Sequence, residues 1–468
     1  MNDLGYILKL LQDAGGMVTS QIINDLNMEW DSLHTKQKDL YDRYTNESVP
    51  IQYRTFTDDN KINRQLNNDF FSEIVDTKTG YFMGVPISYI YDGSDNEKKY
   101  LDTFLMLESA DDKDATTAKN AAIMGLGVRL LYVGQDGEAH IMNVSPWECM
   151  FITDAATDQI QYALRVFDVE YHIPQLNSED DIDRRQRIEW YDAENVYFYE
   201  RSLQDVQKAG KTEKEWLVQP FYNDNGDNVQ PHMFDGVPLL PFLNNNEWMG
   251  DAEKVLQLID AYDRTISDLN SEFESFRLAY MIFKGATIDA DTIALAQKTG
   301  AFSLDDPQAT ADFLTKNLEA EPIENHLDRL EKNIRVFAKT PNFNDENFGN
   351  ESGEAKKYKL MALENKVINS ERKFTKALRD QFKLLFSVWN IKGFNFKIEN
   401  LKFQFTRNLP IDLTYEADVT QKLAGLVSDE TRLSLLSFVE NPEDEMKKME
   451  EDVYPDTQQV DDTDEDTI

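Results

Sequence analysis

The chain has one cysteine, Cys149, so an internal disulfide framework is excluded. No apolar run reaches the ~18–20 residues that a membrane-spanning helix needs. The N-terminal stretch MNDLGYILKLLQDAGG carries Asp3 and lacks a basic region, unlike a signal peptide. We therefore expect a soluble protein that does not depend on an oxidising compartment. Cys149 is expected to be a small buried apolar side chain rather than a nucleophile.

Basic residues are also scarce. The chain has 48 lysines and arginines against 86 aspartates and glutamates, a net charge of −38. Such a chain does not attract nucleic acid by bulk charge, because binding of that kind needs a basic stripe. With 468 residues, of which 41% are apolar, it has room for two or three globular domains.

The sequence lacks recognisable catalytic motifs. Its five histidines are scattered, and none has metal-ligand spacing to another histidine or to Cys149. Neither a G-x-S-x-G elbow nor a dinucleotide-binding fingerprint occurs. The sequence predicts no catalytic residue, no cofactor and no bound metal. An enzyme whose carboxylates come together from distant positions stays open as an alternative.

The first ~125 residues have mostly helical periodicity. Gly80 and Gly84 are expected to bracket a turn into a strand at 85–91. From 128 to 243 the chain instead has short runs rich in Tyr, Phe, Val and Trp, with a hairpin signal at Asp136-Gly137. The N-terminal helices are expected at 22–40, through Val75 and at 114–124.

Helical periodicity then returns in unusually long stretches. At 1.5 Å per residue, a helix at 247–277 is ~45 Å long and one at 353–389 is ~55 Å long. A helix at 323–339 lies between them, after a mixed segment with a short helix at 289–298. The last part of the chain predicts a strand in FKIENLKFQFTRNLP, two helices capped by Ser428 and Asn441, and a disordered acidic tail, DTQQVDDTDEDTI.

A polar stretch, NFNDENFGNESGEAKKYKL, precedes the longest helix. A phosphate-binding loop would need G-x-x-x-x-G-K-[ST] after a buried strand. Here Gly349 and Gly353 have the wrong spacing, Glu351 and Glu354 would meet the phosphate, and a helix comes before the loop. The pattern favours a solvated connection between two helices over a nucleotide site.

The long helices each have a single apolar face, which needs a neighbour to cover it. Head-to-tail contacts between identical subunits would cover these faces and close into a ring. A helical subdomain folded back on its own sheet would also cover them. Periodicity alone leaves both arrangements open.

Several stretches, taken in order, resemble the portal proteins of tailed bacteriophages, in particular those of long-tailed phages of Gram-positive bacteria. The resemblance covers nearly the whole chain. The stretches that carry it are NRQLNNDFFSEIVDTKTGYFMGVPISY, VSPWECMFITD, NESGEAKKYKLMALENKV and FTRNLPIDLTYEADVTQKLAGLVSDETRLSLLSFVENPEDEM.

The resemblance implies an α+β portal-type subunit. Its parts would be a wing of mixed helix and sheet at 1–246 with a strand near 397–407, stem helices at 247–277 and 323–339, a small α/β clip at 278–322, a tunnel loop at 340–352, a long channel-to-wing helix at 353–390, a short helical crown at 411–454 and an acidic disordered tail at 455–468.

The resemblance also implies a structural role without catalysis, in a ring of typically twelve subunits at one vertex of the virion capsid, assembled in the bacterial cytoplasm without a membrane. Double-stranded DNA would pass through the channel during packaging and ejection. The implied partners are the large terminase subunit (the packaging ATPase), the head–tail connector, and the major capsid and scaffolding proteins. The residues expected in the channel are Asn342, Asn344, Asn347, Phe348, Asn350, Lys356 and Lys357.

Two alternatives to this role remain at this point: another ring-forming phage scaffold without a DNA channel, and the enzyme with dispersed carboxylates or a metal. Lys356 and Lys357 are equally well explained as ordinary solvated lysines of a helix.

Overall fold

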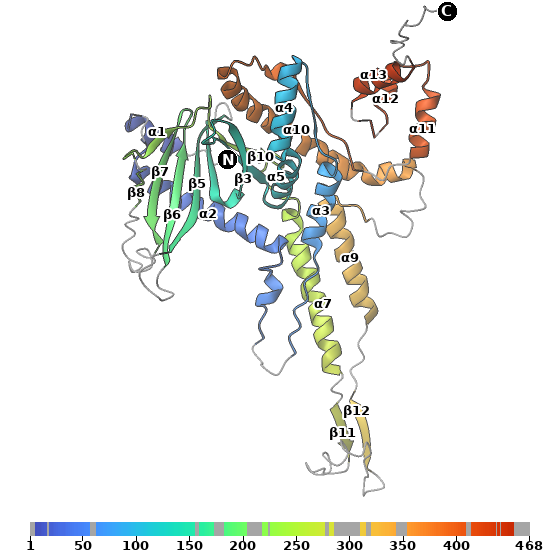
Figure 1. Ribbon diagram of the computed structural model, residues 1–468. Coiled ribbons are helices and arrows are strands. Elements are labelled where there is room, and N and C mark those ends of the chain that lie inside the picture. The colour runs from blue at the N-terminus through green and yellow to red at the C-terminus, as the bar shows by residue number, and fades with distance from the viewer. Residues whose placement is uncertain are drawn as a thin grey trace, which may run out of the picture. The chain divides into compact units, whose positions relative to one another are not determined.

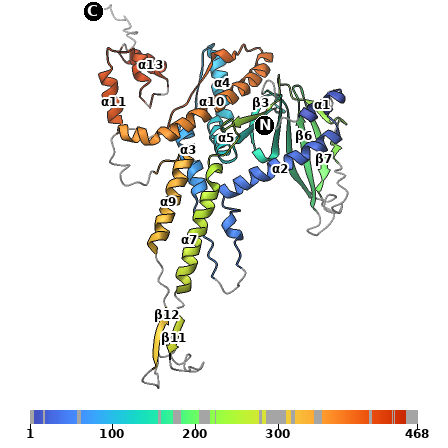
Figure 2. The ribbon, with the colours of Figure 1, turned by 180° about the vertical axis from the view of Figure 1, so that it is seen from behind.

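The fold is described from a computed structural model of the chain (Figures 1 and 2). It describes residues 5–15, 18–56, 62–154, 159–172, 182–203, 218–222, 225–276, 280–284, 309–314, 320–342, 353–408, 413–436, 438–439 and 441–453. The expected helix at 289–298 and the acidic tail at 455–468 lie outside these residues.

The described residues combine helices and antiparallel sheets, which confirms the α+β class. The α-helices are α1 Gly5–Asp13, α2 Ser20–Tyr44, α3 Phe70–Met83, α4 Asp95–Leu107, α5 Ala110–Met124, α7 Leu256–Phe276, α9 Ala320–Ala338, α10 Gly353–Ile391, α11 Leu413–Lys422, α12 Asp429–Leu433 and α13 Pro442–Val453. The short 3-10 helices are η1 Pro50–Tyr53, η2 Pro146–Glu148, η4 Glu253–Val255 and η5 Ile398–Asn400. The strands are β1 Ser88–Tyr91, β2 Leu126–Val133, β3 Ala139–Val144, β4 Cys149–Thr153, β5 Ile160–His172, β6 Ile182–Tyr191, β7 Asn195–Ser202, β8 Gln219–Pro220, β9 Val229–Pro231, β10 Leu239–Leu243, β11 Tyr280–Lys284, β12 Thr310–Leu314 and β13 Leu401–Gln404.

The chain divides into two compact units. The first contains Met1–Lys78 and Thr116–Gly393, and the second contains Thr79–Ala115 and Phe394–Ile468. The boundaries fall inside α3 and α5, so two helices are shared between the units.

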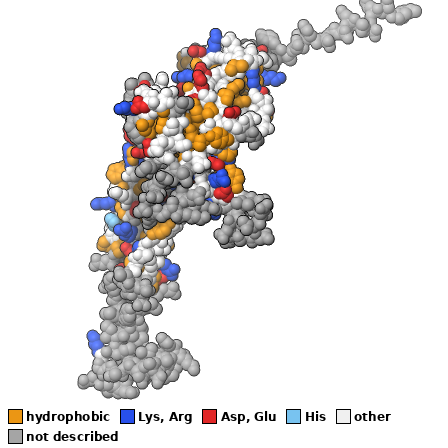
Figure 3. All heavy atoms as spheres, turned by 90° about the vertical axis from the view of Figure 1, so that its left-hand side faces the viewer, with side chains coloured by type: hydrophobic (Ala, Val, Ile, Leu, Met, Phe, Trp, Pro, Cys, Tyr) orange, Lys and Arg blue, Asp and Glu red, His pale blue; other side chains and the backbone are white. Residues whose placement is uncertain are grey.

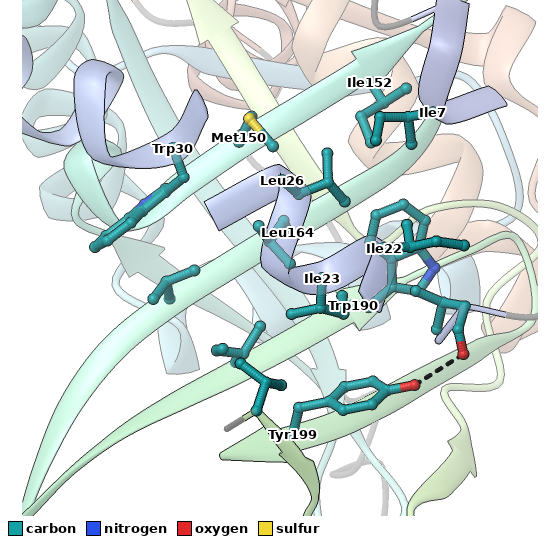
Figure 4. Close-up of a cluster of buried hydrophobic side chains, with 14 of the residues drawn as sticks. Ile7, Ile22, Ile23, Leu26, Trp30, Met150, Ile152, Leu164, Trp190 and Tyr199 are labelled. Atoms are coloured by element: carbon teal, nitrogen blue, oxygen red, sulfur yellow. Dashed lines mark hydrogen bonds between the residues drawn. The ribbon is translucent and has the colours of Figure 1, made fainter. Parts of the chain in front are cut away.

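The largest sheet of the first unit has the order β4-β5-β6-β7-β8, with β9 paired to β7. All its pairs are antiparallel, so alternate side chains point to opposite faces. Helices α1 and α2 cover one face, where Trp30, Leu164 and Trp190 are buried in one apolar cluster (Figure 4). The Tyr199 hydroxyl donates to the Val18 carbonyl at 2.9 Å, which satisfies its polar end inside this core.

A second sheet has the order β10-β2-β3. The predicted hairpin at Asp136-Gly137 is confirmed: β2 and β3 pair on either side of it, and Gly137 has a φ of 77°, which glycine adopts without strain. Cys149 is buried in the apolar cluster of this sheet, as the sequence predicts.

Helices α7 and α9 pack side by side, and the hairpin of β11 and β12 continues beyond their ends (Figures 1 and 2). Helix α9 begins three residues before its predicted start and ends one residue before its predicted end. The predicted start of α7 at 247 is wrong, because the helix begins at Leu256. The preceding chain bonds elsewhere: Asp251 N–H donates to the Ala122 carbonyl and Gly250 N–H to the Glu253 carboxylate.

Helix α10 has 39 residues, which makes it ~58 Å long, and confirms the predicted long helix. Its apolar residues, including Phe374, Phe382 and Trp389, are buried at helical spacing. Phe374 lies against Phe242 of β10, with ring centroids 4.8 Å apart.

In the second unit, β1 pairs with β13. The expected turn at Gly80 is wrong, because α3 continues through it to Met83. Burial of Phe82 and Met83 outweighs the cost of about 1 kcal/mol for a helical glycine. The expected strand near 397–407 is shorter, since β1 offers four residues for pairing. Ser428 caps α12 as predicted, through a bond from Thr431 N–H.

Candidate functional site

Helix α9 ends in a backbone motif that gives the chain a defined exit. Lys339 has a φ of 59°, and its N–H donates to the Val336 carbonyl at 3.3 Å. The next N–H, of Thr340, donates to the Arg335 carbonyl at 3.0 Å. These two bonds form a Schellman motif in which lysine occupies the left-handed position that glycine usually takes. Pro341 follows, and its ring prevents the helix from continuing.

The exit leads directly into the predicted channel loop. Asn342 is exposed. The next predicted channel residues, Asn344, Asn347, Phe348 and Asn350, lie outside the described residues. Lys356 and Lys357 lie near the start of α10, but their side chains are not among those described. The structure therefore does not test whether these side chains come together.

A groove of about 540 Å³ lies between the end of α9 and the start of α10, and Asn342 is part of its wall. Arg335 is bound by two carboxylates, Glu73 at 2.8 Å and Glu331 at 2.9 Å. Lys332 and Lys339 are exposed. The charged side chains that line the groove are Asp328, Glu331, Lys332, Arg335, Lys339 and Lys359.

On the face drawn in Figure 3, the blue side chains are scattered among acidic, apolar and other polar atoms, and the atoms coloured by type form no continuous basic stripe there. Beside Asn342, the groove wall carries four cationic side chains and two carboxylates.

A buried polar cluster joins the end of α9 to other segments. The Asp251 carboxylate lies 3.2 Å from the Lys78 ammonium group and 3.0 Å from that of Lys366. The Asn244 side-chain carbonyl accepts from Lys78 at 2.6 Å and from the Ser370 hydroxyl at 3.0 Å. The sequence analysis missed this cluster. Its members come from α3, the stretch after β10, and α10, so no local pattern points to it.

The polar face of α7 is covered by residues 45–56 and 62–69, which we call the arm. Three arm N–H groups bond to α7 side chains spaced four residues apart: Asn68 to Asp263 at 2.8 Å, Leu66 to Ser267 at 2.9 Å and Arg64 to Ser271 at 3.0 Å. All three acceptor residues are buried. Spacing by four places them on one side of the helix.

Ion pairs extend this contact. Arg54 of the arm pairs with Asp268 at 2.6 Å, and Arg64 pairs with Glu274 at 2.7 Å. Helix α7 is therefore held by α9 through its apolar face and by the arm through its polar face. Periodicity predicted the apolar face of α7 but left its neighbour open, and it missed the arm, because the arm is not a regular element.

In the described ranges, the titratable groups form no obvious catalytic set. Burial raises the pKa of the Cys149 thiol well above its ordinary value, which disfavours the nucleophilic thiolate. Burial also lowers the pKa of His232. Among the described residues, no three or more His, Cys, Asp and Glu side chains are grouped so as to hold a metal ion. No helix in the described part of the chain is both long and apolar enough to cross a membrane.

Comparison with known proteins connects this architecture to a family. The family described as "Phage portal protein, SPP1 Gp6-like" matches residues 23–456. The chain belongs to this family of phage portal proteins. The portal protein of Bacillus phage SPP1 is 25% identical over 427 residues, which cover 85% of this chain and 77% of that protein. The portal protein of Clostridium phage phiCD119 is 24% identical over 222 residues, 46% of this chain and 48% of that protein.

The family match confirms the resemblance noted from the sequence. The matched range includes α7, the β11–β12 hairpin, α9 and α10, so the residues of the groove and of the buried cluster lie within it.

Proposed function

We propose that twelve copies of this portal protein form a ring and that double-stranded DNA passes through its central channel during packaging and ejection. The single observation that carries this proposal is the family match over residues 23–456, nearly the whole chain. The role is structural, and ATP hydrolysis belongs to a partner.

Exposed side chains of α7 and α9 support contacts between copies. Phe273 of α7 is 50% exposed, and Val336 and Phe337 of α9 are each 59% exposed. Large apolar side chains in this number on two neighbouring helices are typical of a surface that another subunit covers.

The two helices differ in charge. Helix α7 carries five carboxylates and one arginine. Helix α9 carries four carboxylates, two arginines and one lysine, and Arg329 and Lys332 are exposed on its later part. A head-to-tail contact would bring α7 of one copy to α9 of the next, and pairing of these two cations with carboxylates of α7 would favour that register.

The loop at 342–352 is proposed to line the narrow part of the channel. Four asparagines and three acidic residues in this loop offer weak, sequence-independent contacts to phosphate. A channel must not hold its cargo, because each fixed cation at a phosphate releases counterions and adds grip. The groove lysines, with Lys356 and Lys357, would form a thin basic ring at the root of this loop.

The remaining parts are proposed to meet other proteins of the virion. Residues 278–322 would form the clip, which faces the large terminase subunit during packaging and the head–tail connector afterwards. Residues 1–246 would form the wing, in contact with the major capsid and scaffolding proteins at one vertex. The ring would assemble in the host cytoplasm.

End-on electron microscopy of the purified protein tests the ring. We expect closed rings with a channel wider than the ~20 Å of a DNA duplex. Compact monomers at every concentration, also in the presence of capsid components, would contradict the ring itself. A ring with a narrower channel would contradict DNA passage.

Two loop variants test the channel assignment. Deleting residues 342–352 is expected to leave rings intact and to abolish DNA packaging in an infection assay. Replacing the same residues by Gly and Ser at equal length keeps the span and removes the amide and acidic groups, so it separates loop length from loop chemistry. Normal packaging by the deletion variant would show that this loop does not serve the channel.

A further inference from the structure

The buried cluster at the end of α9 has an unusual charge balance. The Asp251 side chain is 1% exposed and lies between two ammonium groups, of which Lys78 is 3% exposed and Lys366 is 18% exposed. Burial lowers the pKa of Lys78, and Asp251 only partly offsets this. Burial alone would raise the pKa of Asp251, but the two lysines hold it below its ordinary value.

Such a cluster is weak evidence for added stability. Removing two charges from water costs several kcal/mol, and an apolar replacement of the same shape is often at least as stable. A buried ionic group does specify which segments meet and in which register. Here it joins α3, the stretch after β10, and α10 through hydrogen bonds between residues 126 to 166 positions apart.

The two lysines have different surroundings. Lys78 is enclosed and also donates to Asn244 at 2.6 Å. Asn244 in turn donates to the Asp251 carboxylate at 3.0 Å. Asn244 thus bonds to both Lys78 and Asp251 without Lys366, and we call these three side chains the anchor.

Lys366 instead reaches the end of another helix. Its ammonium group donates to the carbonyl of Ala338, the last residue of α9, at 3.0 Å. The final carbonyls of a helix have no partner within the helix, and a cation there also interacts favourably with the helix dipole. A side chain of α10 therefore caps α9.

Partial exposure gives this cap an alternative state. If Lys366 turned toward solvent, its charge would be hydrated, and Asp251 would keep Lys78 and Asn244. Lys78 has no such alternative state, because its ammonium group would have to leave an enclosed site to reach solvent. Release of the cap is thus possible without disrupting the anchor.

We propose that Lys366 is a releasable latch that fixes the end of α9 against α10 and so sets the distance between the two ends of the segment 343–352. Ala338 precedes this segment and Lys366 follows it in the chain. Closing the latch holds the end of α9 against the side of α10. Opening it lets the end of α9 move while Lys78, Asn244 and Asp251 stay in place. The latch acts within one chain, so its test does not depend on DNA passage.

Hydrogen exchange of the full-length Lys366→Met variant tests the latch. The amides of Lys339 and Thr340, which bond to carbonyls of the last turn of α9, are expected to exchange roughly tenfold faster than in the unmodified protein. Amides of the sheet core are expected to stay unchanged. Lys376→Met is the matched control, because Lys376 is an exposed lysine of the same helix, and it should leave all these rates unchanged.

A second variant separates capping from packing. Lys366→Arg keeps a cationic donor and is expected to restore slow exchange at Lys339 and Thr340. Unchanged exchange in Lys366→Met, or faster exchange spread evenly over the whole protein, would overturn the latch. Failure of Lys366→Met to fold would overturn it too, since Lys366 would then belong to the anchor.

Discussion

The sheet region and the α7–α9 region are held together in different ways. In the first, α1 and α2 bury a continuous apolar cluster against β4–β7 (Figure 4). In the second, α7 buries apolar side chains against α9 and also accepts hydrogen bonds from the arm through buried hydroxyl and carboxylate groups. Phe273, Val336 and Phe337 remain exposed there.

This difference indicates that the first region stabilises the single chain and that the second also serves contacts between chains. Apolar burial is the main stabilising term of folding, so the sheet region can be stable by itself. The α7–α9 region buries part of its apolar side chains and leaves Phe273, Val336 and Phe337 on a surface that the single chain does not cover. We therefore expect mutations in the sheet core to prevent folding, and mutations on the helices to prevent assembly of folded chains.

The largest effect is expected for Trp190→Ala. Trp190 is buried in the sheet core and stacks on Tyr162 with ring centroids 5.0 Å apart. Loss of this side chain should lower the free energy of unfolding by about 3–5 kcal/mol, because a cavity replaces packed atoms. Urea denaturation measures this. Tyr132→Ala, an exposed strand aromatic, is the control and should cost far less; equal losses would contradict an apolar core here.

Phe337→Asp is expected to change the free energy of unfolding little and to weaken ring assembly strongly. Phe337 is 59% exposed, so the free energy of unfolding of the chain should change by less than about 0.5 kcal/mol. Each contact between copies should weaken by about 2 kcal/mol, because an interface aromatic is replaced by a charge. Sedimentation measures the ring fraction.

The control for Phe337→Asp is Tyr222→Asp, which changes an equally exposed aromatic between β8 and β9. It should leave rings intact. Rings that persist in Phe337→Asp, or that are lost equally in both variants, would show that this face of α9 is not the contact.

The two regions also differ in how far the sequence predicts them. The hairpin at Asp136-Gly137 and the helices α9 and α10 follow from turn chemistry and from apolar spacing, which are local. Helix α4 was missed although Ser94 and Glu97 form a capping box at its start, so a signal was present in the sequence.

The contacts that organise the candidate site could not be predicted in that way. Lys78, Asn244 and Asp251 look like ordinary surface residues in the sequence, and only the folded chain brings them together. The arm is similar: three of its hydrogen bonds to α7 come from backbone N–H groups, which leave no trace in residue type. The number of subunits in the ring and the identity of its partners likewise cannot be predicted from the periodicity of one chain.

The smallest expected effect concerns the arm and depends on pH. Asp263 accepts two hydrogen bonds from Asn68, yet its burial raises the pKa of its carboxyl group above the ordinary 3.8. The folded state therefore binds this proton more tightly than the unfolded state, so its contribution to stability falls as pH rises from the ordinary pKa through the raised one. Asp263→Asn keeps an acceptor oxygen and removes the charge. We expect the free energy of unfolding of the variant to rise relative to that of the unmodified protein by up to about 1 kcal/mol as pH rises from 3.5 to 7, with little further change above pH 7.

Urea titrations at several pH values measure the difference. The control is Asp268→Asn, at the exposed end of an arm ion pair, which should lack this gain. If Asp263→Asn instead lost stability relative to the unmodified protein as pH rose, the ionised carboxylate would be what holds the arm, and the arm would be an electrostatic clasp rather than a hydrogen-bonded one.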